Sequence, residues 1–260
     1  MGASVDTVTP TRRTVVRSAA WSVPIVAASM GAPAFAASPC ATSHPWRLDW
    51  NGASTSYPAA PTTNAQGVRT ATATITGPVG TSAMTVTFSS TVVGSDTRTN
   101  ANLRVDAGSY PDVGGTGGTG LLLQHQDIVA GRANSRQQVD ITFGRSVSNL
   151  QFTITDIDSN DQFFGNSNDF YDHVELSGVR TGVPTNRPGG TYVIGSGVQG
   201  DAWRMYSSDL VALDNGSPNG NIAVTYSGAV QAITLVYYTS RGGGNQAIFL
   251  SDLTFDALGC

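Results

Sequence analysis

Residues 150–158 read Leu-Gln-Phe-Thr-Ile-Thr-Asp-Ile-Asp, so that apolar and polar side chains alternate until aspartates end the run. An alternation with a period of two places one face of a β-strand in a core and the other face in water. Residues 84–89 (Met-Thr-Val-Thr-Phe-Ser) and 139–143 (Val-Asp-Ile-Thr-Phe) show the same pattern. These three runs predict half-buried antiparallel strands.

Similar runs occur along the rest of the chain, at 69–76, 121–123, 222–226, 233–238 and 248–255. Turn residues separate them, as in Pro-Gly-Gly at 188–190 and Asn-Gly-Ser-Pro-Asn-Gly at 215–220. Surface helix formers are scarce, because the chain has no lysine and Glu175 is its only glutamate. We therefore predict an all-β fold, a single antiparallel β-sandwich (jelly-roll-like) with long loops rich in Gly and Asn.

The first 37 residues are expected to be a signal peptide. Arg12-Arg13 precedes a short apolar stretch, and Ala-Phe-Ala at 34–36 offers a cleavage site near Ala36 or Ala37. The arginine pair resembles a twin-arginine (Tat) signal, but the usual Phe-Leu after it is missing, which leaves the Sec route as an alternative. The apolar stretch is shorter than the about 20 residues of a membrane span. We expect an exported, secreted protein without a transmembrane anchor, with one domain over residues 38–260.

Charge limits the classes of partner. Removing residues 1–37 removes three of the 14 basic residues and one of the 18 acids, which leaves a net charge of −6. No basic field is present to attract phosphate, so we do not expect a nucleic acid partner. The absence of lysine and the excess of Asp over Glu suggest a GC-rich genome, such as that of an actinobacterium.

The only two cysteines, Cys40 and Cys260, lie near the two ends of the expected mature chain. An even number of cysteines in an exported protein predicts a disulfide. This bond would close nearly the whole chain, which in the chain-entropy model stabilises a fold by about 5 kcal/mol as an upper figure. Two free thiols, or pairing between chains, are the alternatives.

The segment after residue 155 is acidic, with five aspartates in 17 residues. Such close like charges need water or a cation between them, and Ca²⁺ binds carboxylate, amide and carbonyl oxygens. We expect a structural calcium site formed by Asp156, Asp158, Asn160, Asp161, Asp169 and Asp172. It is not an EF-hand, because aspartate stands where that loop requires glycine. The alternative is that these residues only form turns and accept hydrogen bonds from nearby backbone N–H groups.

Three stretches resemble the β-sandwich domains of bacterial surface adhesins and their secreted relatives. They are 150–158, the Asp-Phe-Tyr-Asp-His-Val run at 169–174, and the closing Ala-Ile-Phe-Leu-Ser-Asp-Leu-Thr-Phe run at 247–255. The likeness covers about the second half of the chain. It implies a cell-surface or matrix role in which calcium is sometimes structural, and it carries neither a ligand nor catalytic residues.

A carbohydrate-binding module is the alternative function, because such modules stack sugar rings on exposed aromatic side chains. Large aromatic residues usually fill the core instead, which is the competing interpretation of each candidate. The candidates are Trp46, Trp50, Trp203, Tyr206, Tyr237 and Tyr238.

An enzyme is the remote alternative, as a secreted glycan-active protein. His44, His125 and His173 do not match the spacing of a zinc hydrolase, and no Gly-x-Ser-x-Gly motif accompanies them. No pair of carboxylates stands out as a glycosidase pair. We therefore expect a non-catalytic protein, structural or adhesive, whose partner is a cell-envelope or extracellular glycan or protein.

Overall fold

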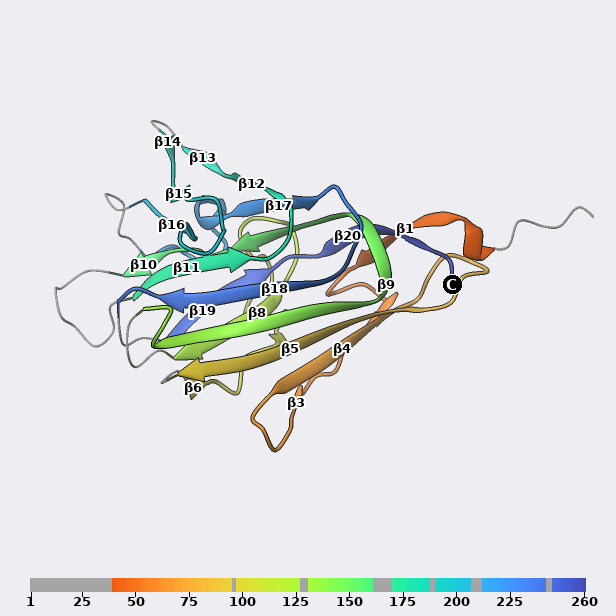
Figure 1. Ribbon diagram of the computed structural model, residues 1–260, viewed down its shortest axis with the longest axis horizontal. Coiled ribbons are helices and arrows are strands. Elements are labelled where there is room, and N and C mark those ends of the chain that lie inside the picture. Colours follow the sequence, from red (N-terminus) through yellow and green to blue (C-terminus); the bar gives the residue numbers. More distant parts are fainter. Residues whose placement is uncertain are drawn as a thin grey trace, which may run out of the picture. The chain divides into compact units, whose positions relative to one another are not determined.

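One long strand, β9 (Ser135–Thr155), belongs to both layers of the fold. Its first part pairs with β5 (Met84–Gly94) and β18 (Val230–Thr239), and its second part pairs with β17 (Ile222–Tyr226) and β20 (Leu253–Leu258). Figure 1 shows the bend between the two parts. Asn149 has a φ of 51° there, a left-handed conformation that asparagine adopts more readily than most residues.

The structure is a computed structural model that describes residues 39–94, 97–126, 131–160, 170–187, 190–206, 212–241 and 245–260. The expected signal peptide, residues 1–37, lies outside these ranges. The chain from Pro39 to Cys260 forms one compact unit. Its described helical elements are two 3-10 turns, η1 (Pro39–Ala41) and η2 (Pro218–Gly220). No helix in the described ranges has the length and apolar character needed to cross a membrane.

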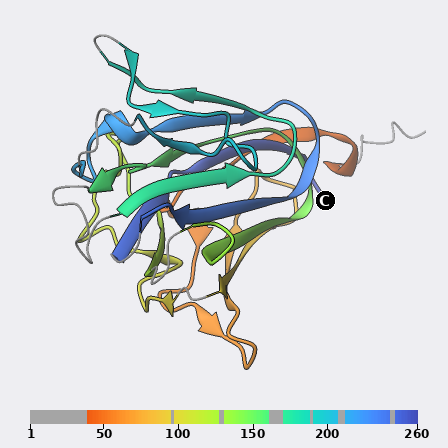
Figure 2. The same ribbon diagram turned by 60° about the vertical axis from the view of Figure 1, so that its left-hand side comes forward.

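The first layer has β9 and β18 near its centre. From one edge to the other its strands are β4 (Arg69–Ile75), β5, the first part of β9, β18, β11 (Phe170–Leu176), β16 (Trp203–Met205) and β15 (Val193–Ile194). The short strands β2 (Thr55–Ser56) and β3 (Thr62–Thr63) pair with β4. Figure 2 shows β11 and β18 side by side.

The second layer contains the remaining long strands. Its order is β12 (Thr181–Pro184), β17, the second part of β9, and then β20 and β19 (Asn245–Leu250), which both pair with β9. Outside these, β1 (Ser43–Leu48) pairs with β20 and β8 (Leu121–Gln126) with β19. Five short strands remain: β6 (Thr97–Arg98) and β7 (Arg104–Val105) pair with β8, β10 (Ser159–Asn160) pairs with β11, and β13 (Asn186–Arg187) and β14 (Gly190–Thr191) pair with each other.

The core lies between the two layers and follows the alternation of the sequence. Val86 and Phe88 on β5 and Ile141 on β9 are buried, and the polar residues between them face outward. Phe143 of β9 packs against Phe255 of β20, with ring centroids 5.3 Å apart. All pairings among the described strands are antiparallel, so the predicted all-β antiparallel sandwich is confirmed.

A disulfide joins Cys40 to Cys260, as predicted, with the two Cα atoms 4.7 Å apart. The pairing of β1 with β20 brings them together, because Ser43 lies opposite Leu258. The bond closes a loop with a sequence separation of 220 residues.

Two strand predictions were wrong in their boundaries. Residues 139–143 and 150–155 were predicted as separate strands but are parts of one strand, because β9 continues through a bend between them. Conversely, the single run 248–255 is divided between β19 and β20. At the division, the Asp252 carboxylate accepts a hydrogen bond from the Trp50 backbone N–H at 3.0 Å. This bond satisfies a backbone donor in the segment that follows β1.

Candidate functional site

The acidic segment folds at the end of β9. Asp156 directly follows this strand and has a left-handed backbone, with a φ of 67°. The pairing of β10 with β11 then brings Asp158 next to Asp172. The Asp172 N–H donates to the Asp158 carbonyl oxygen at 3.1 Å, and the Asp158 N–H donates to Asp172 Oδ2 at 3.4 Å. Three of the six predicted ligands therefore lie at the same end of the sandwich.

These three carboxylates are buried, with exposed fractions of 7% for Asp156, 5% for Asp158 and 0% for Asp172. Burial, followed by the charges of Asp158 and Asp214, raises the pKa of Asp156 to about 8. Burial also raises the pKa of Asp158 to about 7, although the Leu213 N–H donates to its Oδ2 at 2.6 Å and favours the charged form. The pKa of Asp172 is raised well above its ordinary value by burial and then by Asp158.

No arginine compensates this charge, since within the described ranges none of the three carboxylates forms an ion pair. Polar groups continue from Asp172 into the core. Tyr237 Oη donates to Asp172 Oδ1 at 2.8 Å, and the ring of His125 packs edge-on against Tyr237 with centroids 4.5 Å apart. The end of the sandwich that carries the acidic segment thus has a polar interior.

Side-chain oxygens at this end lack donors. Eight buried side-chain oxygens in the described part of the chain have no hydrogen-bond partner, and four of them lie here: Thr155 Oγ1, Asp156 Oδ1, Asn160 Oδ1 and Asn221 Oδ1. Buried acceptors without donors are unfavourable, and oxygens of these types are ligands for calcium. No group of three or more His, Cys, Asp or Glu side chains in the described ranges is arranged to hold a metal ion. A calcium site here would therefore combine carboxylates with neutral oxygens.

Of the other three predicted ligands, one lies at the same end of the sandwich and two are not described. Asn160 is on β10, paired with Phe170 of β11, and Asp161 and Asp169 lie outside the described residues. Asp214 was not predicted, although its charge contributes to the raised pKa of Asp156. Its only local signal is the Asp-Asn-Gly turn in which it lies, so the sequence gives no reason to connect it with residue 156.

The expected sugar-stacking aromatics do not form an exposed row. Trp46, Trp50 and Trp203 are only 3%, 7% and 1% exposed, and Tyr237 is buried as well. Trp50 is anchored by its Nε1–H, which donates to the Ser251 carbonyl oxygen at 2.9 Å. These four residues fill the core, as the competing interpretation predicted, whereas the candidate Tyr206 is exposed.

The histidines lie on three different strands, β1, β8 and β11. His173 on β11 stacks on Tyr238 with centroids 4.9 Å apart, and its Nδ1 lies 2.8 Å from the Tyr171 carbonyl oxygen. Burial lowers the pKa of His173. The His173 ring therefore stabilises the local strand structure by packing on Tyr238.

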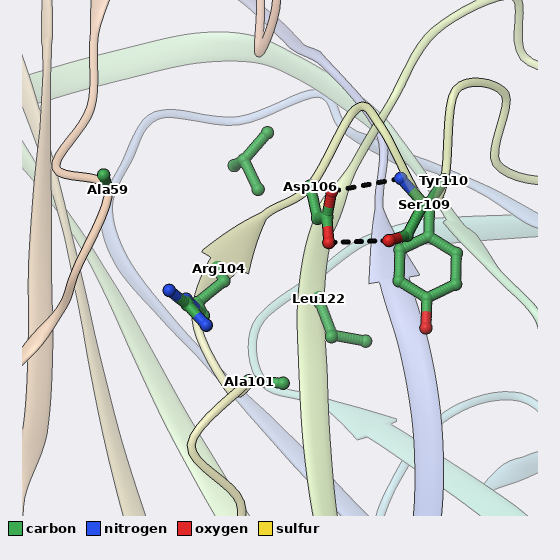
Figure 3. A pocket seen from close by; sticks show the side chains of 8 residues that line it. Ala59, Ala101, Arg104, Asp106, Ser109, Tyr110 and Leu122 are labelled. Atoms are coloured by element: carbon green, nitrogen blue, oxygen red, sulfur yellow. Dashed lines mark hydrogen bonds between the residues drawn. The ribbon is translucent and has the colours of Figure 1, made fainter.

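A cavity of about 400 Å³ lies on the outer side of the second layer. Its floor is Leu122 of β8, and Arg104 and Tyr110 flank this residue on two sides (Figure 3). Asp106 lies above the floor, where Ser109 donates to both of its carboxylate oxygens, from N–H at 3.0 Å and from Oγ at 2.8 Å. Sequence reasoning missed this site, because only the pairing of β7 with β8 brings Arg104 opposite Leu122.

No family model matches the chain, and no curated protein matches it either. Among solved structures, the chain is similar to the adhesin domain of PrgB from Enterococcus faecalis, with a TM-score of 0.36 and 12% sequence identity. The likeness covers 80% of this chain and 66% of that one. The chain thus spans slightly less than two thirds of that domain, and a similarity this low carries no functional argument.

Proposed function

We propose that the protein is an exported, non-catalytic β-sandwich that acts outside the cell or at the cell envelope as a structural or adhesive domain, stabilised by a bound calcium ion. The observation that supports this most directly is the group of buried carboxylates at Asp156, Asp158 and Asp172, which has no positive partner in the described part of the chain. Uncompensated buried charge is strongly unfavourable.

A divalent cation would take the place of the protons that the raised pKa values of Asp156 and Asp158 retain near neutral pH. Asp156 Oδ1 is buried without a donor, and Asn221 Oδ1 and Thr155 Oγ1 lie at neighbouring positions of the paired β9 and β17 chains. Calcium accepts six to eight oxygens in flexible geometry and tolerates such a mixture of ligands. In this role the ion binds the segment after β9 to the turn that contains Asp214, and takes no part in a reaction.

The disulfide supports an oxidising location. It closes the ends of the described chain, and such bonds persist outside the cytosol. Together with the expected twin-arginine signal, the disulfide favours export. The N-terminal sequence of the secreted protein tests this. Cleavage near Ala36 or Ala37 is expected, and an intact leader on the mature protein would contradict export by this route.

The calcium proposal is tested by thermal unfolding of the exported protein at pH 8, with EGTA or with calcium. Calcium at one hundred times its dissociation constant stabilises a fold by about 2.7 kcal/mol. For a domain of this size that corresponds to a rise in Tm of about 5–10 °C. Asp156→Asn is expected to remove most of this rise, whereas Asp201→Asn, an exposed carboxylate that accepts from the Ser196 N–H, should keep it.

An unchanged Tm of the wild-type protein in calcium and EGTA would remove the ion from the proposal.

The adhesive role needs a separate measurement, which is the binding of the labelled protein to cell-envelope preparations and to immobilised extracellular glycans and proteins. Saturable binding without turnover of the bound material supports the role. Release of reducing sugars or cleavage products from the same preparations would instead identify an enzyme.

A further inference from the structure

We infer that the cavity between Arg104 and Tyr110 binds one neutral pyranose unit of a glycan. The inference names a ligand for the binding domain proposed above and rests on that proposal. It uses residues that lie away from the buried tryptophans and away from the acidic segment.

The floor of the cavity is Leu122, whose strand lies between two paired strands. Leu122 of β8 lies opposite Arg104 of β7 on one side and opposite Phe249 of β19 on the other. Leu122 and Phe249 form a small buried cluster on the outer side of the second layer, and Tyr110 packs against it with its ring 4.9 Å from that of Phe249. Leu122 is only 3% exposed, so the apolar surface that the cavity offers comes mainly from Ala101, Val105 and the partly exposed ring of Tyr110.

The backbone that presents Arg104 is held in an uncommon conformation. Leu103 has a φ of 57°, a left-handed conformation that is unfavourable for residues other than glycine. Its N–H donates to the Leu122 carbonyl oxygen at 2.8 Å, and its carbonyl oxygen accepts from Tyr57 Oη at 2.9 Å. Strain that the surroundings maintain in this way is found most often at functional sites. Here it buries Leu103 and leaves the next side chain, Arg104, exposed at the cavity.

Two polar groups of opposite charge are available to a ligand. In the described part of the chain no ion pair or hydrogen bond engages the guanidinium of Arg104. The carboxylate of Asp106 is fixed by Ser109, and these hydrogen bonds lower its pKa, so it is charged at neutral pH. Each of its oxygens accepts one hydrogen bond from Ser109 and keeps a lone pair for another donor.

This combination fits a sugar better than other ligand classes. A pyranose has an apolar face for Val105 and the Tyr110 ring, and hydroxyl groups that donate to Asp106 and accept from Arg104. A phosphate or other compact anion would be repelled by Asp106, and a wholly apolar ligand would desolvate both charged groups without replacing their hydrogen bonds. The volume of about 400 Å³ lies in the range of small-ligand sites.

The test is an array of immobilised neutral hexose, N-acetylhexosamine and uronic acid oligosaccharides, followed by calorimetry with the strongest binder. We expect binding to neutral or N-acetylated sugars. Arg104→Gln and Asp106→Asn should each weaken it at least tenfold with little change in Tm, because both side chains are exposed. Tyr206→Ala, an exposed tyrosine outside the cavity, is the control and should bind as the wild type does.

Tyr110→Ala should also weaken binding, but it removes the packing against Phe249, so Tyr110→Phe is needed to separate folding from recognition. Tyr110→Phe keeps the ring and should retain most of the affinity. Unchanged affinity in Arg104→Gln and Asp106→Asn would overturn the inference, as would binding confined to uronic acids or binding to no oligosaccharide. The proposed function is judged independently, from calcium-dependent Tm values and from envelope binding by Arg104→Gln.

Discussion

The two ends of the sandwich are held in opposite ways. At one end a covalent bond joins Cys40 to Cys260, beside the β1–β20 pair. At the other end, where β9 terminates and β10 begins, three buried carboxylates lie without a positive partner in the described part of the chain (Figure 1). The first end is closed by a covalent bond, whereas the raised pKa values of Asp156 and Asp158 predict that the stability of the second end varies with pH. The same fold thus combines a permanent closure with a conditional one.

Removing the disulfide is expected to have the largest effect. Cys40→Ser with Cys260→Ser opens a loop with a sequence separation of 220 residues, and should lower the free energy of unfolding by about 2–5 kcal/mol. Urea unfolding of the variant and of the wild type measures the difference. A loss below about 1 kcal/mol would show that the β1–β20 pair holds this end without the bond.

The acidic end should make stability depend on pH when calcium is removed. A carboxyl group with a higher pKa in the folded state binds more protons when folded, so rising pH destabilises the fold between the two pKa values. For Asp156 and Asp158 this window runs from about 4 to about 8 and about 7, respectively. Within its window, each group lowers the free energy of unfolding by about 1.4 kcal/mol per pH unit as the pH rises.

Unfolding in EGTA across pH 5 to 8 measures this slope, and calcium should flatten it by stabilising the charged form. Stability that rises with pH in EGTA would contradict the raised pKa values. Asp156→Asn should reduce the slope, because it removes one of the titrating groups.

Tyr237→Phe is expected to have a smaller effect at the same end. It removes the hydroxyl that donates to Asp172 Oδ1 at 2.8 Å, and leaves a buried carboxylate oxygen without its donor, at a cost of about 1–3 kcal/mol. The matched control is Tyr226→Phe, whose hydroxyl donates to the neutral Ser177 carbonyl oxygen at 2.7 Å. Only Tyr237→Phe should steepen the pH dependence of the free energy of unfolding. Equal slopes in the two variants would show that the Tyr237 hydroxyl does not affect the titration of the buried carboxylates.

The smallest effect is expected at the bend of β9. Asn149 has a φ of 51° and donates from Nδ2 to Asp256 Oδ2 at 2.7 Å. Asn149→Ala should destabilise by about 1–2 kcal/mol, mostly through the left-handed backbone. Asn149→Gly loses the same hydrogen bond but relieves the backbone, so it should be the more stable of the two. The reverse order would show that the hydrogen bond matters more than the conformation.

The sequence predicted features that depend on local patterns. Alternation at 84–89 and 150–155 predicted the strands, and the two cysteines predicted the bond that closes the chain. It could not predict that 139–155 forms one bent strand, because a turn and a bend use similar residues. The choice between a buried and an exposed Trp203 depends on packing against distant strands, which periodicity does not specify.

The candidate sites divide in the same way. Asp156 and Asp158 were predicted because they end a strand pattern, and Asp172 because it opens the next one. Asp214 and the cavity at Arg104 were missed, since each depends on chain segments that meet only through strand pairing and loop packing.

The closeness of the two chain ends has a mechanical consequence. A pulling force applied between residues 40 and 260 would act across Cα atoms only 4.7 Å apart that are already joined through sulfur. Such a load passes through the covalent link and leaves the strands unstretched. Strands would be loaded only by a force applied at a second point, such as a ligand held near Arg104. The resistance of the domain to mechanical unfolding would therefore depend on the position of that second point.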